Sequence, residues 1–154
     1  MSIKVRNENK EFEEVYSKSE MDNVQQETIT INSSNEGAGT LEINFRKKGN
    51  MVFVKFFVTL NAGFVSASFV SNFTPPAFAK PIIDNGTLIN SFVPYTIVKE
   101  PSINNKFVLG SYINTFLMAI NSNTLSLICE VKRHTSVDTS SFFDTAGCYI
   151  ANTY

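Results

Sequence analysis

The chain has 154 residues, of which 43% are hydrophobic and only 18% are charged, and it contains fourteen Phe but no Trp. This length accommodates one domain with a full core and leaves no room for a second domain of ordinary size. The net charge is −1 and the basic residues are dispersed, which argues against a nucleic-acid binder, while a surface so short of charge predicts apolar patches that a partner covers.

The N-terminal part is acidic and polar. Residues 1–36 carry eight acidic and four basic side chains, whereas residues 37–154 carry six and nine. Residues 3–6 are β-prone, and Ser17 with Glu20 fits a capping box that predicts a helix over residues 17–26. Such a helix has too few apolar side chains to be stable alone, so we expect it to dock on a partner.

A change of composition marks the predicted domain boundary. Residues 28–31 are β-prone, and residues 32–39 are small and polar, which is typical of a flexible linker or loop. We therefore predict an N-terminal segment with its linker over residues 1–36 and a β domain over residues 37–154.

The segments that follow alternate with a period of two. Apolar residues recur from Leu41 to Phe45 and from Val52 to Leu60, on either side of the turn Lys48-Gly49-Asn50, which predicts a hairpin. Its second strand also has apolar residues on the opposite face, and this face needs either a neighbouring sheet or a symmetric subunit contact to cover it. These residues are Met51, Phe53 and Phe57.

Further short strands are predicted after a proline-rich connector at residues 73–81, in which Phe73 and Phe78 are expected to point inward. A turn at residues 84–86 and a second hairpin around residues 121–123 continue the pattern. The predicted strands span residues 87–93, 95–98, 106–109, 112–120, 124–132 and 148–154. The expected fold is all-β, an antiparallel sandwich or jelly-roll-like domain.

Catalytic and cofactor chemistry is poorly supplied. His134 is the single histidine, and the sequence has no phosphate loop, nucleophile elbow or zinc-ligand spacing. Asp138 and Asp144 fall in a predicted loop at residues 135–146, where solvated acids are the ordinary interpretation. We therefore expect a non-enzymatic protein without a metal or other cofactor.

Simple sequence patterns predict where the protein is located and whether its cysteines are free. The first residues lack the apolar stretch of a signal peptide, and no apolar run is long enough for a membrane-spanning helix, so we expect a product made and kept in the cytoplasm. Cys129 alternates with apolar residues and is expected to be buried, which favours two free thiols over a disulfide with Cys148.

A ligand surface is a second hypothesis. Tyrosines near strand ends, together with asparagine-rich turns, can form an aromatic platform for a saccharide, although half-buried packing is the ordinary role of such residues. The candidates are Tyr95, Tyr112 and Tyr149.

Several segments, taken in their order along the chain, resemble bacteriophage tail-fibre, head-fibre and baseplate attachment proteins. The opening from Ile3 to Asp22, with its Tyr16-Ser-Lys-Ser-Glu-Met-Asp stretch, resembles their N-terminal segments. Gly39-Thr-Leu-Glu-Ile, Phe73-Thr-Pro-Pro-Ala-Phe-Ala-Lys-Pro, Ala119-Ile-Asn-Ser-Asn-Thr-Leu-Ser-Leu and Gly147-Cys-Tyr-Ile-Ala-Asn-Thr-Tyr resemble their C-terminal modules.

This resemblance implies a virion structural protein, made in the host cytoplasm, that carries a homotrimeric β head. Met51, Phe53 and Phe57 would lie near the symmetry axis, and the N-terminal segment would bind other virion proteins, with a host-surface glycan as a further partner. A glycan-binding lectin-like module and a capsid decoration protein are the alternatives. The implied anchoring residues are Ile3, Val5, Phe12, Val15 and Tyr16.

Overall fold

The computed structural model describes residues 3–6, 12–16, 24–82, 91–92, 96–99, 111–134 and 138–151, with side chains for residues 24–82, 111–134 and 138–151. Within these ranges the chain forms antiparallel strands and one short 3-10 turn, η1 (Ala77–Ala79). The strands are β1 (Ile3–Arg6), β2 (Phe12–Tyr16), β3 (Gln25–Asn32), β4 (Gly39–Lys48), β5 (Met51–Leu60), β6 (Ser66–Phe73), β7 (Ser91–Phe92), β8 (Thr96–Lys99), β9 (Tyr112–Asn121), β10 (Thr124–Lys132) and β11 (Ser141–Ile150).

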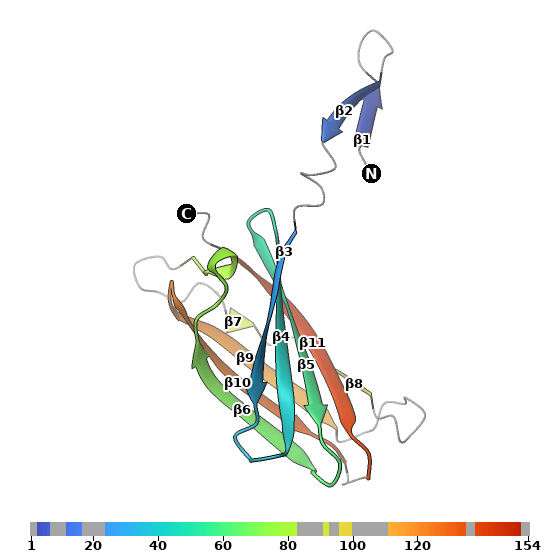
Figure 1. The fold of residues 1–154 in the computed structure, drawn as a ribbon, viewed down its shortest axis with the longest axis vertical. Helices are drawn as coiled ribbons and strands as arrows, with labels where there is room; N and C mark the ends of the chain where they lie inside the picture. The colour runs from blue at the N-terminus through green and yellow to red at the C-terminus, as the bar shows by residue number, and fades with distance from the viewer. Residues whose placement is uncertain are drawn as a thin grey trace.

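Two larger sheets face each other and form a sandwich (Figure 1). One has five strands in the order β3-β4-β5-β11-β8, and the other has four strands in the order β6-β10-β9-β7. β1 and β2 form a separate antiparallel pair. The predicted fold class, all-β with antiparallel sheets, is confirmed.

The core lies between the two sheets and follows the predicted alternation. On β5 every second side chain from Val52 to Leu60 is buried, and on β10 the same is true from Leu125 to Val131. Phe45 of β4 meets Phe73 edge to face, with ring centroids 6.2 Å apart. Because both sheets contribute to one continuous apolar cluster, neither would be covered without the other.

Both predicted hairpins are confirmed. β4 and β5 pair from Gly39 with Leu60 to Lys48 with Met51, and Gly49 at the turn has a φ of 60°, which glycine adopts at little cost. β9 and β10 form the second hairpin. The connector after β6 has the expected form, since it is extended apart from η1, and Phe73 and Phe78 are half-buried against the core.

The predicted helix over residues 17–26 is wrong at its C-terminal end. Gln25 and Gln26 begin β3, which pairs with β4 along its whole length up to Asn32, opposite Thr40. Residues 17–23 lie outside the described residues. β3 therefore belongs to the five-stranded sheet. The boundary expected at residue 36 falls in the connection between β3 and β4, two neighbouring strands of this sheet.

Residues 33–38, part of the stretch expected to be a flexible linker or loop, form a hydrogen-bonded loop between β3 and β4. The side-chain amide of Asn35 donates to the carbonyl of Ser66 at 3.0 Å, and its oxygen accepts from the backbone N–H of Ser68 at 3.2 Å. The N–H of Ser34 donates to the carbonyl of Ser68 at 2.7 Å. These bonds satisfy backbone groups at the free edge of β6 and tie the two sheets together there.

Other differences concern strand positions. β6 was not predicted, and β11 begins at Ser141, so Asp144 lies in a strand and not in a loop. β8 closely matches the strand expected over residues 95–98, and β7 covers part of the one expected over residues 87–93. The turn at residues 84–86 and the strand at residues 106–109 lie outside the described residues. Among the described residues, no helix is long and apolar enough to span a membrane.

Candidate functional site

The outward side of the five-stranded sheet carries the apolar face that the sequence predicted. Phe53 is 49% exposed and Met51 is half-buried. Phe57 stacks on Phe142 of the same chain, with ring centroids 5.8 Å apart and ring planes at 16°. The chain itself therefore covers part of this face, and its open part lies around Phe53.

β11 extends this face with residues that the sequence analysis did not single out. Ile150 pairs with Met51 and is 47% exposed, and the exposed Cys148 pairs with Phe53. Lys55 interrupts the face, with its ammonium nitrogen 3.9 Å from a carboxylate oxygen of Asp144. We use the name Phe53 face for the surface formed by Met51, Phe53, Cys148 and Ile150.

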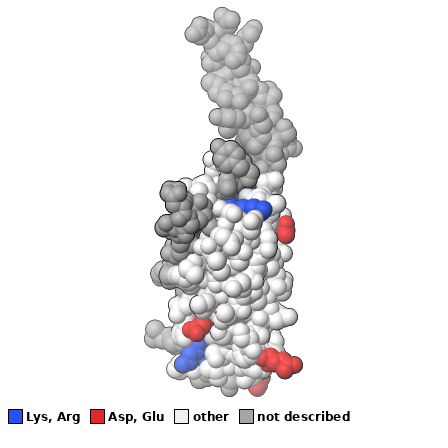
Figure 2. Space-filling model, turned by 90° about the vertical axis from the view of Figure 1, so that its left-hand side faces the viewer, with Lys and Arg blue, Asp and Glu red and all other residues white. Residues whose placement is uncertain are grey.

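The outward side of the four-stranded sheet has a second exposed apolar surface, which sequence reasoning missed. Ile128 pairs with Val70 on one side and Phe116 on the other, so three strands contribute to a single row. All three side chains are exposed, together with Ile120. The side of the molecule that carries β6 also has few charged atoms except near its two ends (Figure 2). The sequence contained a signal for this surface, because β9 has apolar residues at both its inward and its outward positions.

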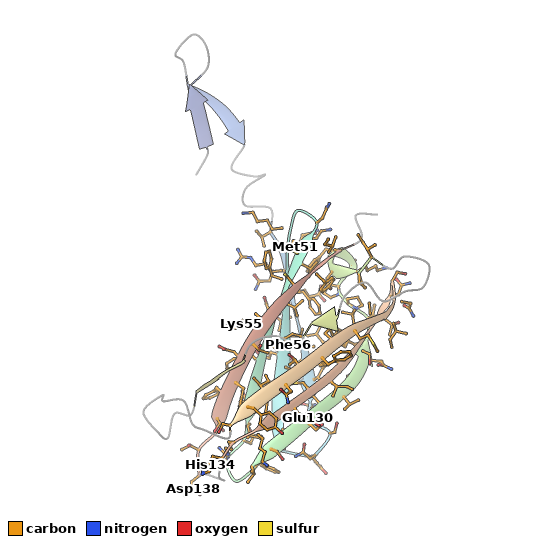
Figure 3. The ribbon with its side chains drawn as sticks, turned by 180° about the vertical axis from the view of Figure 1, so that it is seen from behind. Met51, Lys55, Phe56, Glu130, His134 and Asp138 are labelled. Carbon is orange, nitrogen blue, oxygen red and sulfur yellow. The ribbon has the colours of Figure 1, made fainter. Side chains whose placement is uncertain are left out.

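At one end of this sheet lies a groove of about 520 Å³ that contains Tyr112. Its floor is β10, where Glu130 and Lys132 point outward and are exposed. Figure 3 shows Glu130 near the same end of the sandwich as His134, and Met51 near the other end of the sandwich. We call this the Tyr112 groove; it is lined by Ser34, Asn35, Ser66, Ala67, Ser68, Tyr112, Glu130, Val131 and Lys132.

Of the three predicted ligand-surface tyrosines, Tyr112 and Tyr149 lie on different sheets and are not brought together. Tyr112 is 37% exposed and lines the groove. Tyr149 is 3% exposed, and its hydroxyl donates a hydrogen bond to the backbone carbonyl of Ala79. Burial also raises the pKa of the Tyr149 phenol, so it stays neutral and serves as a core residue with a satisfied polar group. Tyr95 lies outside the described residues.

The predicted anchoring residues fall in the β1–β2 pair. Ile3 pairs with Tyr16, and Val5 pairs with Glu13. Phe12 pairs with Arg6, and Val15 also lies on β2. Antiparallel pairing of the two strands thus places the predicted set on one small two-stranded unit.

A buried arginine supports the end of the sandwich that holds the groove. Arg133 is fully buried, and its guanidinium donates to the carbonyl of Phe64 at 2.6 Å and to that of Thr139 at 2.8 Å. It also donates to the hydroxyl of Ser141 at 2.8 Å and to the carbonyl of Asn61 at 3.1 Å. One side chain therefore joins residues 61–64 to residues 139–141, two segments that are distant from each other in the sequence.

The two cysteines are both free. Cys129 faces the core from β10, and its pKa is raised to about 12, mainly because burial disfavours the thiolate and secondarily because Glu130 is negative. Cys148 is exposed on the other sheet.

Two residues considered for catalytic chemistry lie at the surface. His134 and Asp138 are exposed, and the backbone N–H of His134 donates to the hydroxyl of Ser111 at 3.0 Å. Over the part of the chain that the structure describes, no three His, Cys, Asp or Glu side chains gather where they could hold a metal ion.

No protein family matches the sequence, and no curated protein sequence is similar to it. Among solved structures, the distal domain of the mouse adenovirus 2 fibre, determined as a methylmercury chloride derivative, aligns with 98% of this chain and 94% of its own. The TM-score is 0.53 and the sequence identity is 11%. The chain thus has a fold similar to that of a viral fibre distal domain.

Proposed function

We propose that the chain is a non-enzymatic virion structural protein, a subunit of a short bacteriophage fibre, head fibre or baseplate. Its β domain would be displayed on the particle as a homotrimeric head for attachment to the host surface, and its N-terminal segment would bind other virion proteins. The observation that carries the proposal is the fold shared with a viral fibre distal domain over nearly the whole chain. The resemblance of the opening and closing segments to phage attachment proteins supports the choice of virus.

The Phe53 face supports self-association. Phe53 and Ile150 lie on neighbouring strands and are each about half exposed, and this area would be covered in an oligomer. Fully burying such a side chain contributes about 1.5–3 kcal/mol, and about half of this remains to be gained here because each side chain is already half covered. The face is at the opposite end of the sandwich from the Tyr112 groove, so contacts around the face would leave the groove open (Figure 3).

Oligomeric state provides the first test. We expect light scattering to give a mass three times the 17.2 kDa of the chain, and Ile150→Lys to shift the protein toward the monomer at micromolar concentration, because the new ammonium would be buried in the contact. The matched control is Ile128→Lys on the other sheet, since Ile128 and Ile150 are both 47% exposed.

Two outcomes would contradict this arrangement. A stable wild-type monomer would refute the trimer. Dissociation by Ile128→Lys, with Ile150→Lys unaffected, would place the contact on the four-stranded sheet instead.

A truncation tests the anchoring role. Removing residues 1–23 leaves β3 intact, whereas a cut after residue 30 would remove six of its eight residues. We expect the shorter deletion to leave the melting temperature of the β domain within about 2 °C, since it removes no strand of the sandwich, and to abolish incorporation into particles of the virus that encodes the chain. Western blotting of purified particles is the measurement, with the full-length chain as control. Particles that retain the truncated chain would refute the anchor.

A further inference from the structure

The Tyr112 groove combines an aromatic ring, two opposite charges and several hydroxyl groups on three adjacent strands. Lys132 pairs with Ser66 of β6 on one side and with Tyr112 of β9 on the other. Two positions earlier on the same face, Glu130 pairs with Ser68. The groups that could contact a ligand therefore form two neighbouring rows across the sheet.

The frame of the groove is fixed before any ligand binds. The backbone N–H of Arg133, next to Lys132, donates to the carbonyl of Val65, next to Ser66, at 2.9 Å. The Asn35 side chain holds the loop wall against β6 through two hydrogen bonds. Sites built on strands and locked by such bonds lose little conformational entropy on binding.

The lining selects one class of ligand. A wholly apolar ligand would desolvate the carboxylate of Glu130 and the ammonium of Lys132 without replacing their hydrogen bonds. A nucleic acid would bring its phosphates against Glu130, and Lys132 is the single basic residue among the lining residues. A saccharide satisfies both groups, because vicinal hydroxyls donate to a carboxylate and accept from an ammonium, while a sugar face packs on a tyrosine ring.

We propose that the Tyr112 groove is a binding site for a neutral saccharide, held by Glu130 and Lys132 and stacked on Tyr112. We expect the saccharide to carry no net charge, because the charges of Glu130 and Lys132 cancel. The volume of about 520 Å³ lies within the usual range of roughly 300–1,000 Å³ for small-ligand sites. The inference rests on the proposed function in so far as it names the surface ligand that an attachment head would contact.

The test is an NMR titration of the full-length, ¹⁵N-labelled protein with glucose, galactose, N-acetylglucosamine and lactose at millimolar concentrations. We expect saturable shifts of the backbone amides of Ser66, Ser68 and Glu130 with at least one of these sugars. Tyr112→Ala and Glu130→Gln should each weaken that binding by about tenfold or more.

Matched controls separate the groove from general effects. Phe116→Ala removes another aromatic ring of β9 that is 37% exposed, like Tyr112, and Glu42→Gln neutralises an outward acid on the opposite sheet. Both should bind the sugar as the wild type does, and equal melting temperatures of all variants would show that the fold is retained.

Three results would overturn the inference: no saturable shifts at the groove amides with any of the four sugars, unchanged affinity in Tyr112→Ala, or binding of N-acetylneuraminic acid with none of the neutral sugars. None of these would alter the oligomeric mass or the incorporation into particles. Failure of the saccharide site is thus distinguishable from failure of the proposed function.

Discussion

Replacing Arg133 by alanine is expected to lower the free energy of unfolding by about 3–5 kcal/mol. The guanidinium is fully buried and donates to the carbonyls of Asn61, Phe64 and Thr139 and to the hydroxyl of Ser141. Alanine removes every donor at once, and each carbonyl that stays dry costs about 1–3 kcal/mol. Because domains unfold with about 5–15 kcal/mol in total, this one side chain accounts for a large fraction of the stability.

Urea denaturation followed by circular dichroism measures this loss, provided that the slope of free energy against urea is unchanged. Arg133→Lys should also destabilise, since an ammonium keeps the charge but cannot reproduce the planar fork that reaches several acceptors. The control is Arg46→Ala, an exposed arginine of β4, for which we expect a change within about 0.5 kcal/mol. If Arg133→Ala were within about 1 kcal/mol of the wild type, water would have to reach the freed carbonyls, and the supporting role would be refuted.

Alternation of apolar residues was enough to predict the two hairpins because one face of each strand fills the core. The same rule failed for β6, where only Ala67 and Phe69 are buried, the apolar Val70 points outward, and the remaining positions before Phe73 are serine and asparagine. Arg133 was missed for another reason: a guanidinium beside a histidine at a strand end is usually solvated, and its burial here depends in part on the carbonyl of Phe64, 69 residues away in the sequence.

The candidate site was predicted in part. Tyr112 was identified from its residue type and its place at a strand end, and the structure places it in a groove. Ser66 and Ser68, which line the same groove, come from a strand that was not predicted. The order of strands in a sheet cannot be predicted from local sequence patterns. Tyr149 was misjudged because it lies on the same inward face of β11 as Phe143, and this alternation was missed when the strand was predicted to begin seven residues after its actual start at Ser141.

A second large effect is expected at Gly39, where Gly39→Ala should lower the free energy of unfolding by about 3 kcal/mol. A Cβ at this position would lie 2.1 Å from the backbone carbonyl oxygen of Thr59, far inside van der Waals contact. Because the obstacle is the backbone of β5 and not a flexible side chain, β4 and β5 must separate at the end where Gly39 pairs with Leu60. The shift would also strain the hydrogen bond from the Asn61 N–H to the Ala38 carbonyl, which is 2.8 Å long.

The control for Gly39→Ala is the same substitution at the hairpin turn. Gly49 has a φ of 60°, and a Cβ there would meet nothing within 4 Å, so Gly49→Ala should cost about 1 kcal/mol from backbone conformation alone. Chemical denaturation of both variants measures the difference. A clearly larger loss at Gly39 means that close packing of two strands requires this glycine. Equal losses would instead support the flexible linker that the sequence suggested over residues 32–39, because a linker glycine has no neighbour to displace.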